Sequence, residues 1–417
     1  MKIVFLTQVL PYPLNAGPKL RAYYVLRQLA AQHEVLLVSF SRQEDRADHI
    51  EHLRQFCAGV YTVPMVRSAR RTLCAVVTAL AHKEPVIIAR DRVAAMRRQI
   101  EDVFAAHGPV DAVHADQTSM VQYALGAAGL QTPRPRLVLD AHNALHQVFR
   151  RLAEQSGNPL RRRLLAWEAD RLAAYETEHY TQFDEVVFVT EIDRARLDLP
   201  HAHVIPICVE PQVEAMCAVA APTAEVKSRQ VLFVGTLFWP PNAEGAAWFV
   251  REVWPLVLAR CPDARLVIAG KRAPVSLLQL ADAAQHVAVA GYVDDLTALV
   301  TQSTLFIAPL HAGGGMRVKI VDAWNWGIPV LATTVGAEGL DYVAGEHLLI
   351  ADAADAFAAA TVRLLDDPAL AARLCEAGRC LVRRAYDWRR VYAAWDSIYA
   401  GSLAFSPARA EPETLCN

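Results

Sequence analysis

Three consecutive glycines, Gly313, Gly314 and Gly315, come directly before the basic residues Arg317 and Lys319. Glycine lets backbone amides approach a ligand closely, and the first turn of a helix offers free N–H groups and the positive end of its dipole. Two basic side chains add full charges. A glycine run alone would indicate an ordinary surface turn. The whole combination, placed after a strand, predicts a phosphate-binding site instead.

Two carboxylates lie near this run. Asp322 stands about one turn into the predicted helix, where it could accept hydrogen bonds from ribose hydroxyls. Glu338 follows a later strand in the sequence VGAEGL, where it either lies near the same ligand or caps its own loop. Both positions extend the candidate site beyond the glycines.

A second set of polar residues lies at strand ends in the first half of the chain. His114 and Asp116 belong to VHADQ, and His142 belongs to LDAHN. Since neighbouring positions on a strand alternate between its faces, VHAD could direct either His114 or Asp116 towards a ligand. The alternative for each histidine is a core or surface role, because the chain has 14 histidines. Gly17, between the first strand and a helix, completes the set or is an ordinary turn residue.

Short β-rich runs alternate with longer helical patterns, which predicts βαβ units and parallel sheets buried on both faces. Ligands bind at the carboxyl ends of such strands. The alternation stops and restarts once, so we expect five segments: an N-terminal Rossmann-like domain (1–208), a linker (209–229), a second Rossmann-like domain (230–385), a helix (386–400) and a tail (401–417). The expected strands are 2–7, 34–40, 112–115, 136–142, 185–190 and 203–207, then 230–235, 265–270, 287–291, 304–310, 329–334 and 347–351.

Composition fits two compact domains. The chain has 417 residues, 53% of them hydrophobic and 21% charged, which argues against disorder. A net charge of −2 gives no indication of a nucleic-acid partner. Eight cysteines lack metal-like spacing, so we expect reduced thiols in a cytoplasmic protein. The N-terminus lacks the features of a signal peptide, and the apolar run 72–81 is shorter than the ~20 residues of a membrane span.

The sequence resembles the group 1 glycosyltransferases, the large retaining family 4. The run PLHAGGGMRVKIVDAWNWGIPVLATTVGAEGL (309–340) is similar to the family's donor-binding signature, as are residues 231–272 and GYVDDLTALV (291–300). WPPN and GxGxRxK resemble motifs of a subgroup. The ending YDWRRVYAAWDSIYA is similar to the family's closing helix, which crosses back to the N-terminal domain. The likeness covers most of residues 1–400 and is stronger in the second half.

The resemblance implies an α/β GT-B fold, with two Rossmann-like doubly wound domains facing a central cleft, no metal, and a nucleotide-diphosphate sugar as co-substrate. Arg317 and Lys319 would offset the charge of the departing diphosphate. The implied catalytic residues are His142, His114 and Asp116, with a histidine assisting rather than acting as a nucleophile. The implied donor-binding residues are Gly17, Gly235, Thr236, Tyr292, Val293, Gly313, Gly314, Gly315, Arg317, Lys319, Asp322 and Glu338.

The chain departs from the family pattern at several of these positions. Of the two glutamates in the family's Glu-x7-Glu motif, the first is replaced by Gly314 and the second by Asp322. Thr236 lies in a segment where many members carry arginine and lysine, and Ala16-Gly17 replaces the usual double glycine. The missing glutamate leaves the donor sugar open.

We therefore expect a metal-independent glycosyltransferase that moves a sugar, with retention of configuration, to a glycan or lipid-linked saccharide in cell-surface polysaccharide assembly. The alternatives are a non-catalytic nucleotide-binding scaffold of the same fold and a nucleotide-sugar epimerase. The basic and apolar stretch from Arg70 to Leu80 predicts peripheral contact with an anionic membrane at its cytoplasmic face.

Overall fold

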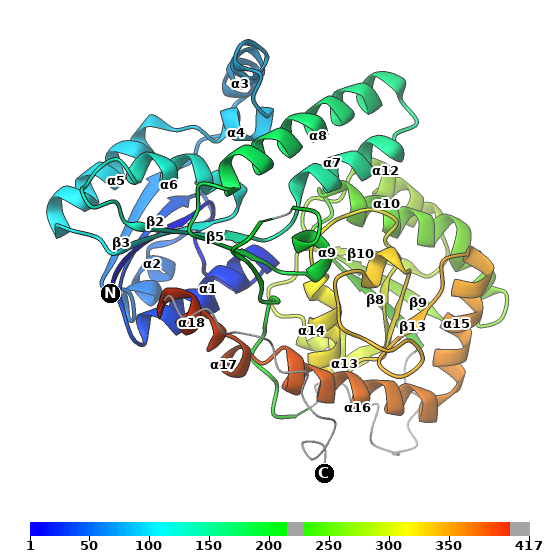
Figure 1. Cartoon of the computed structure of the whole chain (residues 1–417). Helices are drawn as coiled ribbons and strands as arrows, with labels where there is room; N and C mark the ends of the chain where they lie inside the picture. The colour runs from blue at the N-terminus through cyan, green and yellow to red at the C-terminus, as the bar shows by residue number, and fades with distance from the viewer. Residues whose placement is uncertain (198, 215–228, 401–417) are drawn as a thin grey trace. The chain divides into compact units, whose positions relative to one another are not determined.

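The computed structural model describes residues 1–197, 199–214 and 229–400, which form two compact units (Figure 1). Unit 1 contains Met1–Cys208, Gly314–Met316 and the chain from Trp388 to the end of the described residues. Unit 2 contains Val209–Gly313 and Arg317–Asp387, apart from the stretch that is not described. Most of the expected linker and the whole expected tail, 401–417, lie outside the described residues.

Unit 1 is built on a seven-stranded parallel sheet in the order β3-β2-β1-β4-β5-β6-β7. Its strands are rich in valine, leucine and isoleucine, and their side chains are buried on both faces because helices cover both sides. The strands are β1 (Lys2–Thr7), β2 (Glu34–Ser41), β3 (Gly59–Pro64), β4 (Ala112–Asp116), β5 (Arg136–Ala141), β6 (Glu185–Phe188) and β7 (Ala202–Val204).

The helices of unit 1 follow these strands in sequence. Local sequence starts two of them. Pro18 lies in the first turn of α1, and the side chain of Asn158 caps α8 by accepting hydrogen bonds from the amides of Leu160 and Arg161. The helices are α1 (Gly17–Ala30), α2 (Ala47–Arg54), α3 (Ala69–His82), α4 (Val86–Arg90), α5 (Ala94–His107), α6 (Val121–Ala127), α7 (Leu145–Glu154), α8 (Pro159–Tyr180), α9 (Glu191–Arg194), α17 (Trp388–Val391) and α18 (Ala394–Ala400).

The C-terminal helices α17 and α18 pack on unit 1 although the preceding helix belongs to unit 2. The stretch expected to form one helix over 386–400 forms these two short ones. Gln28 of α1 donates to both carboxylate oxygens of Asp396, at 3.2 and 3.0 Å. The aromatic side chains of Tyr392, Trp395 and Tyr399 are buried, which is the core packing that their helical spacing predicts.

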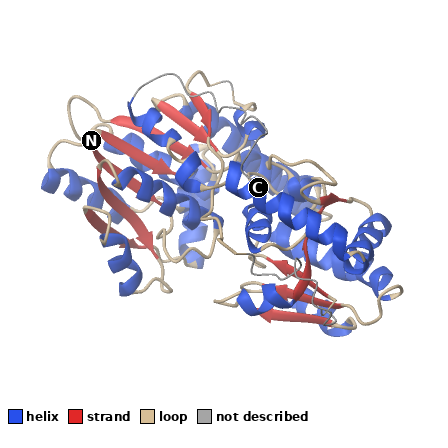
Figure 2. Cartoon of the chain, turned by 90° about the horizontal axis from the view of Figure 1, so that it is seen from below, coloured by secondary structure: helices blue, strands red, loops and turns tan. Residues whose placement is uncertain are grey.

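Unit 2 has a six-stranded parallel sheet in the order β10-β9-β8-β11-β12-β13, with helices on its faces (Figure 2). The strands are β8 (Gln230–Val234), β9 (Arg265–Ala269), β10 (Val287–Gly291), β11 (Ser303–Ala308), β12 (Val330–Ala332) and β13 (Leu349–Ile350). The α-helices are α10 (Pro240–Trp248), α11 (Trp254–Leu258), α12 (Val275–Ala283), α13 (Thr297–Gln302), α14 (Val318–Trp326), α15 (Ala354–Asp366) and α16 (Pro368–Ala385).

The strand orders fix where a ligand can approach each sheet. In unit 1 the chain leaves β1 in one direction and returns to β4 on its other side, and in unit 2 the same reversal separates β8 from β11. Doubly wound sheets bind ligands at these reversal points, beyond the carboxyl ends of the strands. The loops after β1, β4, β8 and β11 are therefore the places to look for the site, and they carry most of the predicted residues.

Two sequence-based expectations need correction. Strand β3, GVYTVP, was not among the expected strands, because one short run with a glycine and a proline carries little periodicity. The expectation that every cysteine is a free thiol is wrong for Cys380, which is disulfide-bonded. The spacing argument addressed only cysteines close in sequence, and a disulfide can join distant ones. Among the described residues, no helix is long and apolar enough to cross a membrane.

Candidate functional site

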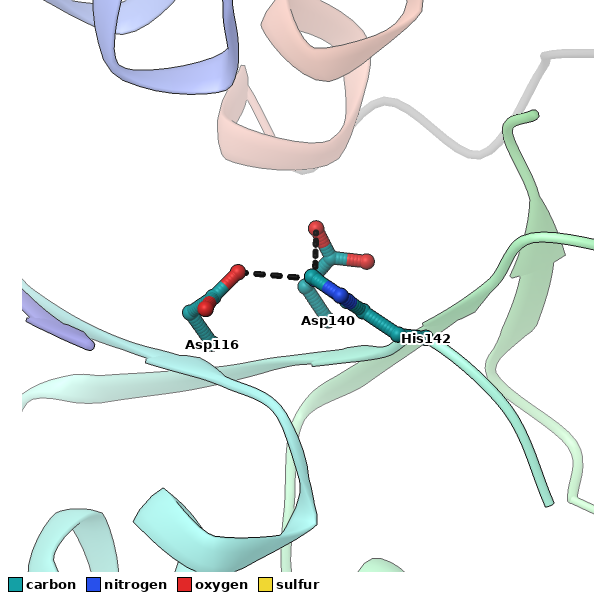
Figure 3. Close-up of side chains that lie close together, drawn as sticks. All are labelled: Asp116, Asp140 and His142. Atoms are coloured by element: carbon teal, nitrogen blue, oxygen red, sulfur yellow. Dashed lines mark hydrogen bonds and ion pairs between the residues drawn. The ribbon is translucent and has the colours of Figure 1, made fainter. Parts of the chain in front are cut away.

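Asp116, Asp140 and His142 form a buried cluster at the carboxyl ends of two neighbouring strands in unit 1 (Figure 3). Asp116 ends β4 and is in register with Asp140 of β5, and His142 follows β5. The Nε2 atom of His142 lies 2.8 Å from a carboxylate oxygen of Asp116 and 3.7 Å from one of Asp140. The parallel pairing of β4 and β5 thus brings together groups that are 26 residues apart in the chain.

Arg21 neutralises the second carboxylate of this cluster. Its Nε and Nη2 donate to the two oxygens of Asp140 at 2.8 and 3.0 Å, and its Nη1 donates to the carbonyl of Pro206 and to the hydroxyl of Tyr392. Arg21 lies one turn beyond Gly17, which is the first residue of α1. The loop that holds Gly17 therefore continues directly into the helix that fixes Asp140.

The charges of the cluster balance when His142 is protonated. Burial acts to lower the pKa of His142, but the Asp116 carboxylate outweighs it and the pKa is raised. Burial acts to raise the pKa of Asp140, and Arg21 and His142 outweigh it, so that the pKa is lowered. Burial raises the pKa of Asp116, and the nearby His142 acts against that rise. With both carboxyl groups ionised, two carboxylates face one guanidinium and one imidazolium. The three side chains are close enough together to bind a metal ion. Arg21 and protonated His142 already supply positive charge at this position.

His114 has a different environment from His142. Its side chain is fully buried, its ring stacks on Phe5 at 4.0 Å between centroids, and its Nδ1 lies 2.8 Å from the hydroxyl of Tyr399. Burial lowers its pKa to about 3, so it is neutral. The strand alternation does not separate His114 from Asp116, because residues two positions apart share a face. His114 packs beneath α18, and Asp116 meets His142 further along the same strand.

His142 keeps one ring nitrogen for a ligand. Its Nδ1 is buried without a hydrogen-bond partner among the described residues, and the side chain is 7% exposed. An unpaired buried N–H or lone pair costs stability. Because Nε2 is bonded to Asp116, Nδ1 is the ring atom of His142 that can form a further hydrogen bond.

The glycine-rich loop connects β11 to α14. Gly313 has a φ of +134°, and a Cβ there would lie 2.8 Å from the guanidinium of Arg317, so only glycine fits. Arg317 is the N-cap residue of α14 and is buried, and its Nη2 donates to the carbonyl of Val335 at 3.3 Å. Glu338 comes three residues after that carbonyl, directly after a short 3-10 helix. Arg317 therefore connects the loop that carries Gly313, Gly314 and Gly315 to the loop that carries Glu338.

Lys319 lies beside the loop that follows β8. Its Nζ donates to the side-chain carbonyl of Asn242 at 2.7 Å and sits 4.6 Å from the centre of the Phe233 ring. Asn242 in turn donates to the carbonyl of Thr236 at 3.0 Å. A Cβ on Gly235 would lie 2.8 Å from the same Nζ. Gly235 and Thr236 thus belong to one small cluster with Lys319.

The ammonium of Lys319 is in an unfavourable environment. Burial and the nearby Arg317 lower its pKa to about 7. No ion pair joins Lys319 to a carboxylate within the part of the chain that the structure describes. An anion that bound there would restore the charged form. The arrangement is that of a receptor for a negatively charged ligand.

The other predicted residues of unit 2 lie around this edge of the sheet. Asp322 is half-buried on α14, and burial raises its pKa to about 7. Tyr292 follows β10, is 44% exposed, and lies under the ammonium of Lys271 at 3.9 Å. Val293, the next residue, is half-buried. An exposed aromatic ring beside a lysine at a strand end is a suitable contact for the base of a nucleotide.

Sequence reasoning did not identify Arg21, Asp140 or Asn242 as site residues. Asp140 lies two positions before His142, and strand alternation would have placed both on one face. Asn242 was visible in the WPPN motif, but its bond to Lys319 joins residues 77 positions apart. Arg21 carried no signal beyond its position on the helix after Gly17, because its partners come from three distant segments, those of Asp140, Pro206 and Tyr392.

Comparisons with known proteins agree with this geometry. Residues 228–367 match the family model "Glycosyl transferases group 1". An uncharacterised 44.6 kDa protein from the cps region of Klebsiella pneumoniae is 23% identical over 365 residues, which is 84% of this chain and 87% of that protein. The phosphatidyl-myo-inositol mannosyltransferase of Mycobacterium leprae is 30% identical over 176 residues, which is 41% of this chain and 46% of that protein.

The fold is also found in solved structures. The Anabaena protein HepE, solved in complex with UDP, superimposes with a TM-score of 0.63 at 14% identity, over 96% of this chain and all of that one. Each of the two units has the parallel sheet of a GT-B fold, as the sequence predicts. Residues 228–367 thus resemble a group 1 glycosyltransferase domain.

Proposed function

We propose that the chain transfers a sugar from a nucleotide-diphosphate sugar to a hydroxyl of a glycan or lipid-linked saccharide, with retention of configuration and without a metal. The observation that carries the donor part is the pair Arg317 and Lys319 beside the glycine-rich loop, with a lysine whose pKa is about 7 and which lacks a carboxylate partner among the described residues. That HepE was solved with UDP supports a nucleotide donor.

The roles of the residues follow from the chemistry that each environment allows. The amides of Gly313, Gly314 and Gly315, with Arg317 and Lys319, bind the diphosphate and stabilise its growing charge as it departs. Asp322 accepts hydrogen bonds from the ribose hydroxyls, and Glu338 lies beside the nucleotide sugar on the next loop. Gly235 and Thr236 line the phosphate side, and Tyr292 with Val293 contacts the base.

In the proposed reaction, the bond between the anomeric carbon and the diphosphate oxygen breaks, and the acceptor oxygen bonds to that carbon on the same face. The acceptor proton passes to the departing diphosphate. His142, held in place by Asp116, donates a hydrogen bond from Nδ1 to the sugar and forms no covalent intermediate. His114 positions α18 from within the core, and Gly17 opens the helix that carries Arg21.

The first test is a thermal-shift screen with UDP, GDP, ADP and TDP in EDTA, on the wild type and on Arg317→Ala. Arg363→Ala, an exposed arginine on α15, is the matched control. Ligand binding raises the melting temperature by mass action. A shift with one nucleotide, kept in Arg363→Ala and lost in Arg317→Ala and Lys319→Met, supports the donor site. Absence of a shift with every nucleotide argues for the non-catalytic scaffold.

The acceptor part of the proposal includes peripheral contact with an anionic membrane through α3. Leu73, Val77 and Leu80 are 66%, 59% and 62% exposed and recur at helical spacing along one face. Arg70 and Arg71 stand at the start of the same helix. An exposed apolar face beside basic residues is typical of helices that lie in a membrane interface. The Mycobacterium leprae relative, named for phosphatidyl-myo-inositol, supports a lipid-linked acceptor.

Flotation with vesicles tests the membrane contact. We expect the wild type to float with phosphatidylglycerol vesicles at low salt, and Leu73→Asp with Val77→Asp to remain in the pellet fraction. Leu256→Asp, at an exposed leucine of unit 2, is the matched control and keeps the wild-type behaviour. Equal flotation of all three proteins would remove α3 from the proposal and leave the donor site untouched.

A further inference from the structure

A polar cavity of about 550 Å³ lies in unit 1, away from the His142 cluster. It is open to solvent on one side and is lined by the end of α3, the start of α4, the side of α8, and residues of α5 and α6; in Figure 1, α3 and α8 are labelled at the top of the view. Its volume is within the range of small-molecule sites. None of its lining residues belongs to the sites described above.

The lining is predominantly cationic. Lys83, Arg92, Arg97 and Arg171 contribute four positive charges, against two negative charges from Glu84 and Glu178. Arg92 already forms an ion pair with Glu84, with its Nη1 and Nη2 donating at 3.0 and 2.6 Å. The remaining three cations face one acid. The excess positive charge favours an anionic ligand.

Two groups in this cavity have hydrogen-bonding capacity that the described residues do not use. Arg97 forms no ion pair within the described part of the chain. The hydroxyl of Tyr175 is buried and has no hydrogen-bond partner among the described residues, and the side chain is only 7% exposed. Its ring is fixed by stacking on His179 at 4.1 Å between centroids. A buried hydroxyl left without a partner is costly, and a bound oxygen would satisfy it.

The cavity adjoins the apolar face of α3. His82 is the last residue of α3 and Lys83 caps it, and both line the cavity. Arg171 of α8 donates to the carbonyl of Lys83 at 3.3 Å and so fixes this end of the helix. Leu80, which is 62% exposed, comes two residues before His82. A ligand with a charged head and an apolar tail would match both features at once.

We propose that this cavity binds the phosphate group of a lipid, with Arg97, Arg171 and the Tyr175 hydroxyl as its donors and the lipid chain lying along the exposed face of α3. Guanidinium groups match phosphate oxygens through paired N–H donors. The proposal rests on the membrane part of the proposed function and is independent of the donor site in unit 2.

The test measures binding of three soluble probes to the full chain by calorimetry: dioctanoyl phosphatidic acid, dioctanoyl phosphatidylcholine and inorganic phosphate. The variants are Arg97→Gln and Tyr175→Phe. Arg98→Gln is the matched control, because Arg98 is the next residue on α5, is exposed and does not line the cavity. The nucleotide thermal shift, measured on the same proteins, reports whether unit 2 is intact.

We expect phosphatidic acid to bind the wild type and Arg98→Gln equally, and to bind Arg97→Gln at least about tenfold more weakly, as the loss of a charged hydrogen bond implies. Tyr175→Phe should weaken binding by a smaller factor. Equal binding by Arg97→Gln and Arg98→Gln would overturn the site. Equal affinity for inorganic phosphate and phosphatidic acid would overturn the lipid assignment. If the nucleotide still raises the melting temperature of these variants, the donor site does not depend on the cavity.

Discussion

Arg21 and Asp140 form a two-pronged ion pair inside unit 1, with Nε–Oδ2 and Nη2–Oδ1 distances of 2.8 and 3.0 Å and both side chains fully buried. The same guanidinium lies 5.1 Å from the ring centres of Tyr392 and Trp395. One side chain therefore joins the sheet, helix α1 and the C-terminal segment. It fixes the strand end next to which His142 stands.

Replacing Arg21 should destabilise unit 1 more than removing the whole ion pair. Arg21→Met leaves the Asp140 carboxylate buried without its cation, and we expect a loss of about 3–5 kcal/mol in the free energy of unfolding. Arg21→Met combined with Asp140→Leu should recover part of that loss. Urea unfolding followed by the fluorescence of the buried tryptophans measures both. A loss below about 1 kcal/mol in Arg21→Met would contradict the role of the pair.

Removing the Asp116 carboxylate should change the pH dependence of the reaction. Because that carboxylate raises the pKa of His142, Asp116→Asn lowers it, and His142 loses its proton at lower pH. The alkaline limb of kcat/KM should therefore move to lower pH in Asp116→Asn. His142→Ala should reduce kcat by about 10²–10³-fold, as expected for the loss of a donor to the transition state.

The matched control is Asp111→Asn, at a carboxylate before β4 that binds the backbone of Lys2 and lies outside the cluster. It should keep the wild-type pH profile. An unchanged alkaline limb in Asp116→Asn would show that His142 does not titrate in the reaction.

Donor affinity should weaken as pH rises above about 7. Lys319 is charged below its folded pKa of about 7 and neutral above it, whereas a bound diphosphate favours the charged form. We expect the Kd of the nucleotide sugar to rise about tenfold per pH unit between roughly pH 7.5 and 9. Lys319→Arg should remove this slope, because arginine stays protonated throughout.

A nucleotide sugar is the better probe for this titration than a free nucleotide diphosphate. A terminal phosphate has a second pKa near 6 and would change its own charge in part of the range. Calorimetry at each pH gives the Kd directly. The same slope in Lys319→Arg would assign the titration to another group.

Asp322→Asn should stabilise the free protein at alkaline pH and weaken donor binding. The folded pKa of Asp322 is raised to about 7 from 3.8 by burial, so its contribution to stability is lost as pH rises from about 4 through 7. The variant should melt at a higher temperature than the wild type at pH 8, and the difference should be smaller at pH 5. Its half-exposed position reduces the size of the effect.

In the same variant the melting-temperature shift caused by the nucleotide should shrink, because an amide is a weaker acceptor for ribose hydroxyls than a carboxylate. Asp355→Asn, at an acidic residue in the first turn of α15, is the control for both effects. Stabilisation without any change in nucleotide binding would remove Asp322 from the ribose site.

The sequence by itself determined the class of fold and the position of the glycine-rich loop. Strand-and-helix alternation predicts parallel sheets because it depends only on short-range periodicity, and the run from Gly313 to Lys319 carries its glycines, helix start and cations within seven consecutive residues. The position of His142 at a strand end follows in the same way. Features that local sequence can encode were therefore accessible without coordinates.

Tertiary structure alone decided which groups surround these residues. Arg21 meets Asp140 across 119 positions and Tyr392 across 371, and Lys319 meets Asn242 across 77. The different environments of His114 and His142 also depend on packing, because the hydroxyl of Tyr399 in α18 lies beside Nδ1 of His114, whereas the carboxylate of Asp116 lies beside Nε2 of His142. Side-chain charge and hydrogen bonding depend on burial and on neighbours supplied by the strand order, and no local pattern specifies those.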